Sequence, residues 1–215
     1  MGEPKRWTFG VEPLPEALEI ATRLRNVASL VLSLEASHPA LERLAASLRS
    51  AEAELAKLVP GDLAPRIGPH SGADRRSYID HSRDVGAFNP FFPEYQIEID
   101  GDRASGTVAF PIAFEGPPGV VNGGVLATFF DLVVQHHNCD VGVAGKTTSI
   151  AVRYRRPTPL LRELAFAVER AVADGRITST ARLAAGGDVL CEAEVRAVAG
   201  DLAALPNVSP RRPGA

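Results

Sequence analysis

The chain has 215 residues, a length typical of one domain with an extension, and its 45% hydrophobic and 23% charged residues exclude a wholly disordered protein. A formal net charge of −3 speaks against a nucleic-acid-binding protein, and no run of about 18 apolar residues predicts a membrane span. Because Cys139 and Cys191 are the only cysteines and the first residues lack the apolar core of a signal peptide, we expect a cytoplasmic protein without a disulfide framework.

Residues 1–59 are predicted to form a helical hairpin. Apolar residues recur with the spacing of one helix face between residues 14 and 31 and again between residues 41 and 58. Two such helices do not enclose a core of their own, so the hairpin is expected to pack on the rest of the chain or on another subunit. Residues 1–60 mix seven Lys and Arg with eight Asp and Glu, whereas a membrane-surface helix needs a basic face. The pattern favours an interaction element.

Residues 60–93 are rich in Gly, Pro, Asp and Arg and are predicted to be a linker or a lid. Three aromatic residues gather near the end of this segment: Phe88, Phe91 and Phe92. Two compatible interpretations are open, a hydrophobic plug that packs the segment down or a cover over an apolar ligand. On the second interpretation, Phe88 and Phe91 are candidate substrate-binding residues.

Residues 94–200 have the pattern of a β-rich domain. Strand-like segments at 95–99 and 104–114 flank the turn Gly101-Asp102, an apolar helix begins near Asn122, and four more strands follow between residues 147 and 198. Two strands, one helix and four strands predict an α+β domain with an antiparallel meander. Residues 201–215 are expected to be a flexible tail.

The predicted helix over residues 123–138 contains an unusual carboxylate. Eight of the ten residues 125–134 are apolar, which indicates a helix buried on all sides, and Asp131 is the one Asp, Glu, Lys or Arg in the whole segment. Burying a carboxylate without partners costs several kcal/mol. Asp131 is therefore expected to face a cavity or to be tightly hydrogen-bonded, and a functional acid is favoured over a structural one.

The same helix begins with Asn122-Gly123-Gly124. Asn is a good N-cap, and the two glycines leave the first N–H groups accessible at the positive end of the helix dipole. A carbonyl oxygen bound there would be polarised as in an oxyanion hole. The nine residues from Asn122 to Asp131 correspond to about 13 Å of helix. Because one reacting carbon does not span that distance, we expect a dimer whose protomers share the site.

Two segments of this domain resemble a known family: GPPGVVNGGVLATFFD and TTSIAVRYRRPTPL. In this order of strands and helix they are similar to the hotdog-fold thioesterases of the PaaI-like, 4-hydroxybenzoyl-CoA thioesterase-related superfamily. The human mitochondrial enzymes with a GPPG…HGG segment are the most similar, and GAFNP resembles the segment before the first strand of actinobacterial members. The resemblance spans roughly residues 94–199 and implies a hotdog fold, an antiparallel sheet wrapped around a central helix.

The family pattern is His-Gly-Gly followed, nine residues after the His, by an acid on the central helix. Carried onto this sequence, the resemblance implies that Asp131 is the general base or the nucleophile. It also implies that the N–H of Gly123 polarises the thioester carbonyl, with Gly124 beside the substrate. The Ser or Thr that assists the acid falls on Thr147, and two neighbours could substitute for it: Thr148 and Ser149.

The resemblance further implies an acyl-CoA substrate from which coenzyme A leaves as the thiol, no other cofactor, and a homo-oligomer. The coenzyme A phosphates need cations. Four arginines lie on or after the strand that follows the site, although a solvated strand face is the alternative interpretation: Arg153, Arg155, Arg156 and Arg162.

Asn122 stands where the family has His. Asn can cap the helix and present Gly123, but it does not exchange a proton near neutrality. Two functions therefore stay open. One is an acyl-CoA thioesterase, and the other is a catalytically weakened acyl-CoA binding or scaffolding protein whose hairpin recruits a partner.

Other chemistries are not favoured. His136 and His137 are adjacent and so point in different directions from a helix, and no metal is expected. Cys139 lacks a base at a recognisable spacing. The hotdog hydratase motif Gly-Asp-x-Asn-Pro-x-His is superficially similar to residues 86–92, but Ala87 and Phe92 stand in place of its Asp and His.

Overall fold

The computed structural model describes residues 15–58, 85–141 and 145–199. In chain order the elements are α1 (Pro15–Leu32), α2 (Pro39–Leu58), α3 (Val85–Phe88), β1 (Tyr95–Asp100), β2 (Arg103–Ala109), the 3-10 turn η2 (Ile112–Phe114), α4 (Gly123–Asp140), β3 (Gly145–Tyr154), β4 (Glu163–Ala173), β5 (Arg176–Ala185) and β6 (Asp188–Ala199). The predicted order of two strands, one helix and four strands is confirmed. Most of the predicted linker and the whole predicted tail, residues 60–84 and 201–215, lie outside the described residues.

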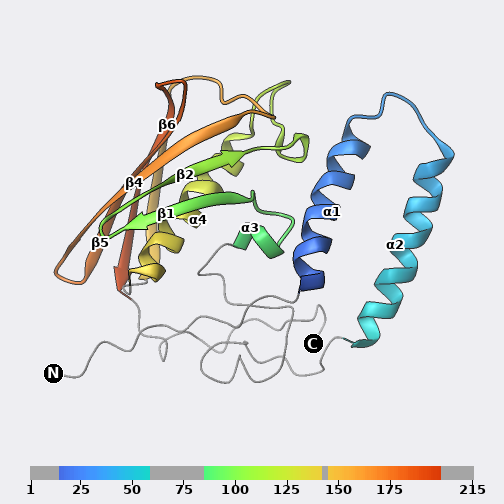
Figure 1. The fold of residues 1–215 in the computed structure, drawn as a ribbon, viewed down its shortest axis with the longest axis horizontal. Helices are drawn as coiled ribbons and strands as arrows, with labels where there is room; N and C mark the ends of the chain where they lie inside the picture. The colour runs from blue at the N-terminus through green and yellow to red at the C-terminus, as the bar shows by residue number, and fades with distance from the viewer. Residues whose placement is uncertain (1–14, 59–84, 142–144, 200–215) are drawn as a thin grey trace.

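The six strands form one antiparallel sheet in the order β1-β2-β4-β5-β6-β3. Buried and exposed residues alternate along β4 and β5, so one face of the sheet carries the core. Figure 1 shows α4 lying against this face, with the strands curving around it. The predicted α+β class, an antiparallel sheet wrapped around a central helix, is therefore confirmed.

Helix α4 supplies five of the twelve largest fully buried side chains of the described residues. Phe129 is fully buried and makes edge-to-face contacts with three rings, at centroid separations of 5.3 to 6.1 Å: Tyr95, Phe110 and Phe166. Helix, sheet and the loop before α4 all contribute to this cluster, which fixes the helix relative to the strands.

None of the described helices, α4 included, is long and apolar enough to cross a membrane.

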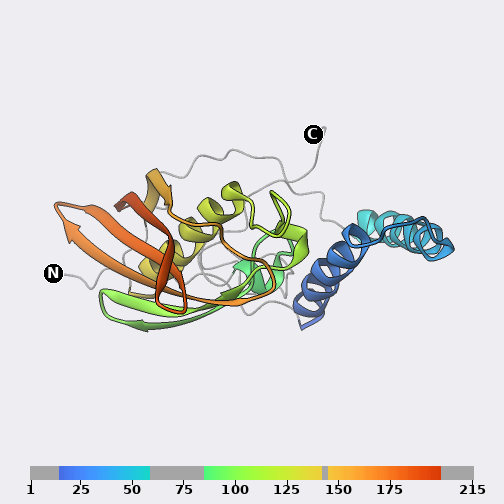
Figure 2. The same ribbon diagram turned by 90° about the horizontal axis from the view of Figure 1, so that it is seen from above.

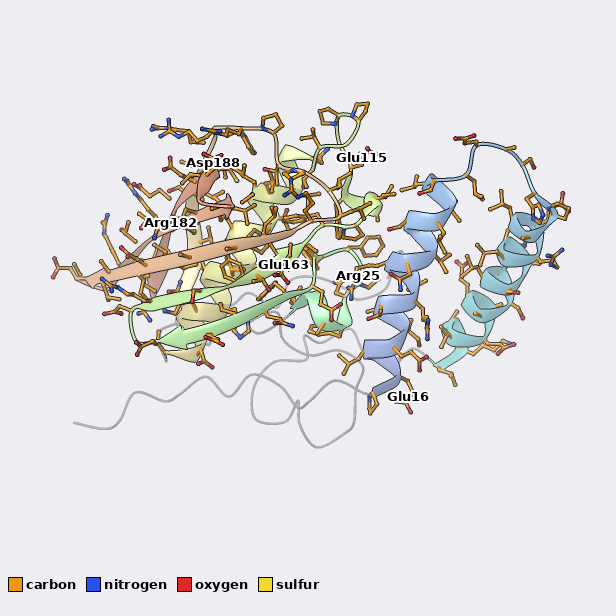
Figure 3. All side chains as sticks on the ribbon, turned by 45° about the horizontal axis from the view of Figure 1, so that its top comes forward. Glu16, Arg25, Glu115, Glu163, Arg182 and Asp188 are labelled. Carbon is orange, nitrogen blue, oxygen red and sulfur yellow. The ribbon has the colours of Figure 1, made fainter. Side chains whose placement is uncertain are left out.

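The N-terminal helices differ in how they attach. Figure 2 shows α1 beside the hotdog domain and α2 farther out. Helix α1 packs on α3 and on η2, with Ala21 and Arg25 buried, whereas α2 has no buried residue. Figure 3 labels Arg25, whose guanidinium lies between α1 and the chain before β1. Its Nη1 donates to the carbonyl of Gly86 at 2.6 Å and its Nη2 to the carboxylate of Glu94 at 2.9 Å.

Buried His137 makes the stability of this domain depend on pH. Its Nε2 bonds to the carbonyl of Gly101 at 2.8 Å, which requires a proton on that nitrogen, and its Nδ1 has no partner among the described residues. Burial lowers the pKa of His137 below its usual 6.5, so the ring is neutral in the fold. Unfolding restores the usual pKa, so between pH 6.5 and the lower pKa of the folded state the unfolded chain binds a proton that the folded chain does not.

We expect the free energy of unfolding to fall as the pH drops below about 6.5, by up to about 1.4 kcal/mol per pH unit from this one group. Urea unfolding between pH 7.5 and 5 measures the slope. His137→Gln should flatten it, whereas His38→Gln, at an exposed position, should leave it unchanged. Equal slopes in the two variants would show that His137 is not the responsible group.

Candidate active site

The start of α4 is built by the loop that precedes it. Asn122 caps the helix, because its Oδ1 accepts the N–H of Gly124 at 2.8 Å, while its own N–H donates to the carbonyl of Phe114 at 2.9 Å. A Cβ on Gly116 would lie 2.8 Å from the Cα of Asn122, so this close approach requires glycine. Among the described residues, the N–H of Gly123 has no acceptor. It is therefore open to an external oxygen at the positive helix end.

A tyrosine from β3 also holds the helix start. The hydroxyl of Tyr154 donates to the carbonyl of Gly123 at 2.7 Å, and a Cβ on Gly123 would come within 3.2 Å of that hydroxyl oxygen. Tyr154 is not among the predicted site residues. The two residues lie 31 positions apart, and the sequence holds no signal for their contact beyond the place of Tyr154 in the second motif segment.

Asp131 is half-buried and has one side-chain hydrogen-bond partner among the residues that the structure describes. The hydroxyl of Thr147 donates to its Oδ1 at 2.7 Å. Because α4 is apolar around this point, the carboxylate depends on β3 for its hydrogen bond. The structure thus brings together the predicted acid and the predicted Thr.

A β-bulge decides which of the three neighbouring hydroxyls reaches Asp131. The register between β3 and β6 shifts between Thr147 and Ser149, so Thr148 is the extra residue, and its hydroxyl donates to the carbonyl of Arg196 at 3.1 Å. After the bulge, the residues that face α4 are even-numbered, as Tyr154 is. Ser149 therefore lies on the outer face of the sheet, and in the described chain no hydrogen bond joins Thr148 or Ser149 to Asp131.

The helix start and the carboxylate are far apart within one chain. Asp131 follows Gly123 by eight residues, which corresponds to about 12 Å along α4. The open N–H group and the acid therefore do not converge on one atom within a protomer.

The two candidate substrate-binding phenylalanines lie elsewhere. Phe88 ends α3, which packs against α1, and Phe91 is 83% exposed in the turn that follows. Neither belongs to α4 or β3, which carry Asp131 and Thr147. The described chain does not bring these rings together with the carboxylate.

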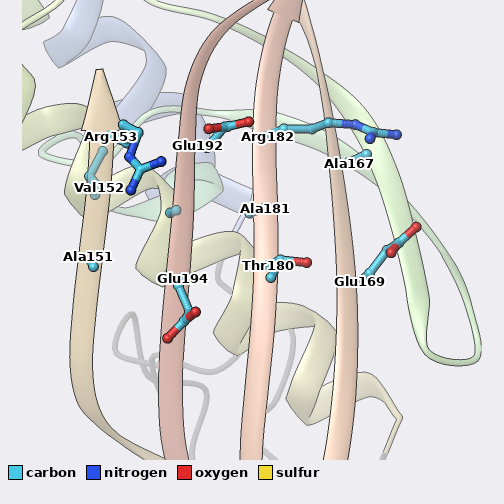
Figure 4. A pocket seen from close by; sticks show the side chains of 11 residues that line it. Ala151, Val152, Arg153, Ala167, Glu169, Thr180, Ala181, Arg182, Glu192 and Glu194 are labelled. Carbon is cyan, nitrogen blue, oxygen red and sulfur yellow. The ribbon is translucent and has the colours of Figure 1, made fainter. Parts of the chain in front are cut away.

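The candidate arginines divide between two surfaces. Arg153 lines a cavity of about 560 Å³ on the sheet face that points away from α4, where it alternates with acidic residues such as Glu192 (Figure 4). Arg155 pairs with Glu192 at 2.8 Å. Arg156 and Arg162 instead line a second cavity of about 570 Å³, together with Pro157 and Pro159. This segment forms bridges to the chain just before α4, at Val120 and Val121.

The cysteines do not resemble activated nucleophiles. Both Cys139 and Cys191 are buried. Burial raises the pKa of the Cys191 thiol to about 12, far from the range in which a thiolate forms at neutral pH. Within the described ranges, no group of three or more His, Cys, Asp or Glu is arranged to hold a metal ion.

Comparison with known proteins places this geometry in context. No protein-family model matches the chain, and no curated protein matches it. A crystal structure of a thioesterase superfamily protein matches with a TM-score of 0.71 and 29% identity, over 87% of this chain and 97% of that chain.

Two further solved structures match about half of the chain. A hypothetical thioesterase from Streptococcus pneumoniae with coenzyme A has a TM-score of 0.46 and 21% identity, over 50% of this chain and 90% of that one. A putative thioesterase from Ralstonia eutropha, described as phenylacetic acid degradation-related, has a TM-score of 0.44 and 17% identity, over 48% and 83%.

The chain has the hotdog fold, and the solved structure with which it shares 29% identity is a thioesterase superfamily protein. The predicted resemblance is thereby confirmed. The similarity over nearly the full length of the first of these structures supports a function of the thioesterase type.

Proposed function

We propose that this protein hydrolyses acyl-CoA thioesters to a free acid and coenzyme A. The observation that carries the proposal is the pair formed by Asp131 and Thr147, a carboxylate on the central helix held at 2.7 Å by a strand hydroxyl. A carboxylate in a mostly apolar setting is suited to attack a carbonyl or to take a proton from water.

Asp131 has one oxygen for positioning and one for chemistry. Oδ1 accepts the hydrogen bond of Thr147, which orients the carboxylate and leaves Oδ2 for the reaction. As a general base, Oδ2 takes a proton from water while the water oxygen attacks the thioester carbon. As a nucleophile, Oδ2 attacks that carbon and water then hydrolyses the anhydride. In both cases the C–S bond breaks: in the first route the sulfur of coenzyme A receives the proton that Oδ2 took from water, and in the second it leaves as a thiolate that takes a proton from water.

The start of α4 is suited to stabilise the charge that develops on the carbonyl oxygen. The N–H of Gly123 has no acceptor among the described residues, and the helix dipole adds positive potential there. Asn122 keeps this N–H accessible, because its side chain caps Gly124 instead of occupying the position in front of Gly123.

A homodimer brings the N–H of Gly123 and the carboxylate of Asp131 together from two protomers. Because about 12 Å of helix separates Gly123 from Asp131, the helix start of one protomer acts with Asp131 of the other. Strand β3 lies at the edge of the sheet and exposes Ile150 and Tyr154, at 37% and 53%. An edge strand with exposed apolar side chains is suited to pairing with a second chain.

Arg156 and Arg162 are the arginines best placed for the phosphates of coenzyme A. They line a cavity beside the segment that bridges to Val120, close to the start of α4. Arg156 pairs with Asp188 at 3.2 Å, but both side chains are largely exposed, so this ion pair is weak and a phosphate can replace it.

Hydrolysis is tested by measuring free thiol after mixing the purified protein with acyl-CoAs that carry short, long and aromatic acyl groups. We expect release above the background rate for at least one class. A specific observation supports the second candidate, an acyl-CoA-binding protein: Asn122 occupies the position of the family His and serves as a helix cap. A protein that is inert toward the whole panel but binds acyl-CoA would establish that second function.

The hydroxyl of Tyr154 is expected to matter for the rate. Tyr154→Phe removes the hydrogen bond to the carbonyl of Gly123, so the first turn of α4 is held less firmly and kcat should fall about tenfold, the equivalent of about 1.4 kcal/mol. Steady-state kinetics measure this. Ser149→Ala, on the outer face of the same strand, is the matched control and should keep the wild-type kcat. A Tyr154→Phe protein with the wild-type kcat would show that the contact does not position the helix start.

A further inference from the structure

Helix α2 exposes three of its leucines, Leu48, Leu55 and Leu58, whereas Leu41 and Leu44 are half-buried. It has no buried residue and makes no extensive contact with any other described element. Ten of the sixteen large hydrophobic side chains that are exposed in the described residues lie between residues 18 and 58, three of them on α2 and seven on α1 and the turn after it. In Figure 2, α2 is the helix farthest from the sheet. Such a concentration of exposed apolar surface marks an interaction site.

The apolar residues of α2 follow the heptad spacing of a coiled coil. Alternating steps of three and four residues connect six positions: Leu41, Leu44, Leu48, Ala51, Leu55 and Leu58. A strict spacing of this kind places all six on one seam of the helix, which is suited to pack against a single second helix.

The apolar seam of α2 can pair with the same seam of a second copy when the two helices run antiparallel. In an antiparallel pair of α2 helices centred between Arg49 and Ser50, Leu41 faces Leu58 of the second copy, and Leu44 faces Leu55. The remaining layer joins Leu48 to Ala51 of the second copy. Each layer therefore contains at least one leucine, and the small Ala51 always meets a large residue.

The charges of α2 favour the same arrangement. Its first half, residues 39–49, carries two Arg and one Glu, and its second half, residues 50–58, carries two Glu and one Lys. The halves thus have net charges of +1 and −1. An antiparallel pair places each half opposite the half of opposite charge, whereas a parallel pair places like halves together.

We propose that α2 is a docking surface for α2 of a second copy of this chain, in an antiparallel pair. The proposal does not depend on the thioesterase activity. One such pair is about 30 Å long. Because an independent interface buries roughly 1,000 Å², the exposed apolar residues of α1, such as Ile20 and Leu30, are available to extend the contact.

Disulfide cross-linking of the full chain tests the arrangement. In the antiparallel pair, Ser47 lies beside Glu54 of the second copy, so Ser47→Cys with Glu54→Cys should give a covalent dimer on mild oxidation. Within one helix the two cysteines are about 10.5 Å apart, too far for a bond. The native cysteines are buried and do not interfere. Ala46→Cys with Ala53→Cys has the same spacing on the opposite face and should give no covalent dimer.

The absence of a covalent dimer from the seam variant, or equal yields from both variants, would overturn the proposal. Packing of α2 on α1 of the same chain would produce the first of these results.

Sedimentation gives a second, independent measurement. Leu48→Glu with Leu55→Glu should raise the dissociation constant of self-association at least tenfold, because two charges enter the seam. Ala46→Glu with Ala53→Glu adds the same charges on the opposite face and should leave the constant unchanged. Unchanged association of the leucine variant, or equal weakening by both variants, would contradict the pairing of the α2 helices.

Discussion

Replacing Asp131 with Asn should lower kcat/KM for acyl-CoA at least about 100-fold, the range expected for loss of a general base. Asn has nearly the same shape, and its carbonyl oxygen can still accept the hydrogen bond of Thr147. What it cannot do is take a proton from water or attack a carbonyl near neutral pH. The fold should persist because the side-chain volume and the contact with β3 are both kept. Free thiol release under substrate-limited conditions measures the loss.

Asp174→Asn is the matched control for this variant. Asp174 is exposed in the turn between β4 and β5, and its φ of 50° suits Asn as well as Asp. It should hydrolyse acyl-CoA at the wild-type rate. Equal thiol release by Asp131→Asn and wild type would remove Asp131 from the mechanism. A rate loss in both variants would point to a general effect of carboxylate removal.

The fold follows from signals that are local in the sequence. Helix α4 is predictable because its apolar residues leave no polar face, and such a helix has to lie at the centre of a domain. The hairpin turns are predictable because two-residue loops need positive φ, which Asp-Gly and similar pairs adopt readily. In the loop between β4 and β5, φ is 50° at Asp174 and 71° at Gly175.

Only part of the candidate site can be predicted from short stretches of the sequence. Asp131 is visible in the sequence as a charge in an apolar helix, and Asn122 as a cap before two glycines. The choice among Thr147, Thr148 and Ser149 depends on a bulge, which is a mismatch between β3 and β6 and has no signature in either strand alone. Tyr154 is hidden for the same kind of reason, since its partner is a backbone carbonyl on another element.

The attachment of α1 is the least visible feature in the sequence. A buried arginine on a helix with recurring apolar residues is not predictable from periodicity, and, apart from Thr22 three residues earlier, the partners of Arg25 are backbone carbonyls and one carboxylate 61 to 69 residues away. Through α1, Arg25 is also connected to the candidate site. Helix α1 packs on η2, and the last residue of η2, Phe114, accepts the N–H of Asn122 at the start of α4.

Replacing Arg25 with Met should destabilise the docking of α1 by about 2 to 4 kcal/mol. Met keeps much of the side-chain length but has no donors, so the carbonyls of Gly86 and Asn89 lose their hydrogen bonds and Glu94 loses its ion pair. The loss should be local. Backbone amides of α1 should exchange with deuterium at least about 30-fold faster, the ratio that 2 kcal/mol represents, while those of β4 and β5 keep their protection.

The comparison with Arg23→Met separates the docking contact from a general effect of losing an arginine. Arg23 lies two residues earlier on α1, is 72% exposed, and pairs only with Glu19, at 3.6 Å, among the described residues. An exposed pair of this kind contributes less than about 1 kcal/mol. Arg23→Met should therefore leave exchange in α1 within a few-fold of wild type. Equal exchange rates in the two variants would mean that α1 is held by its apolar contacts alone, because the carbonyls of the 85–94 segment would then be satisfied by water when the guanidinium is gone.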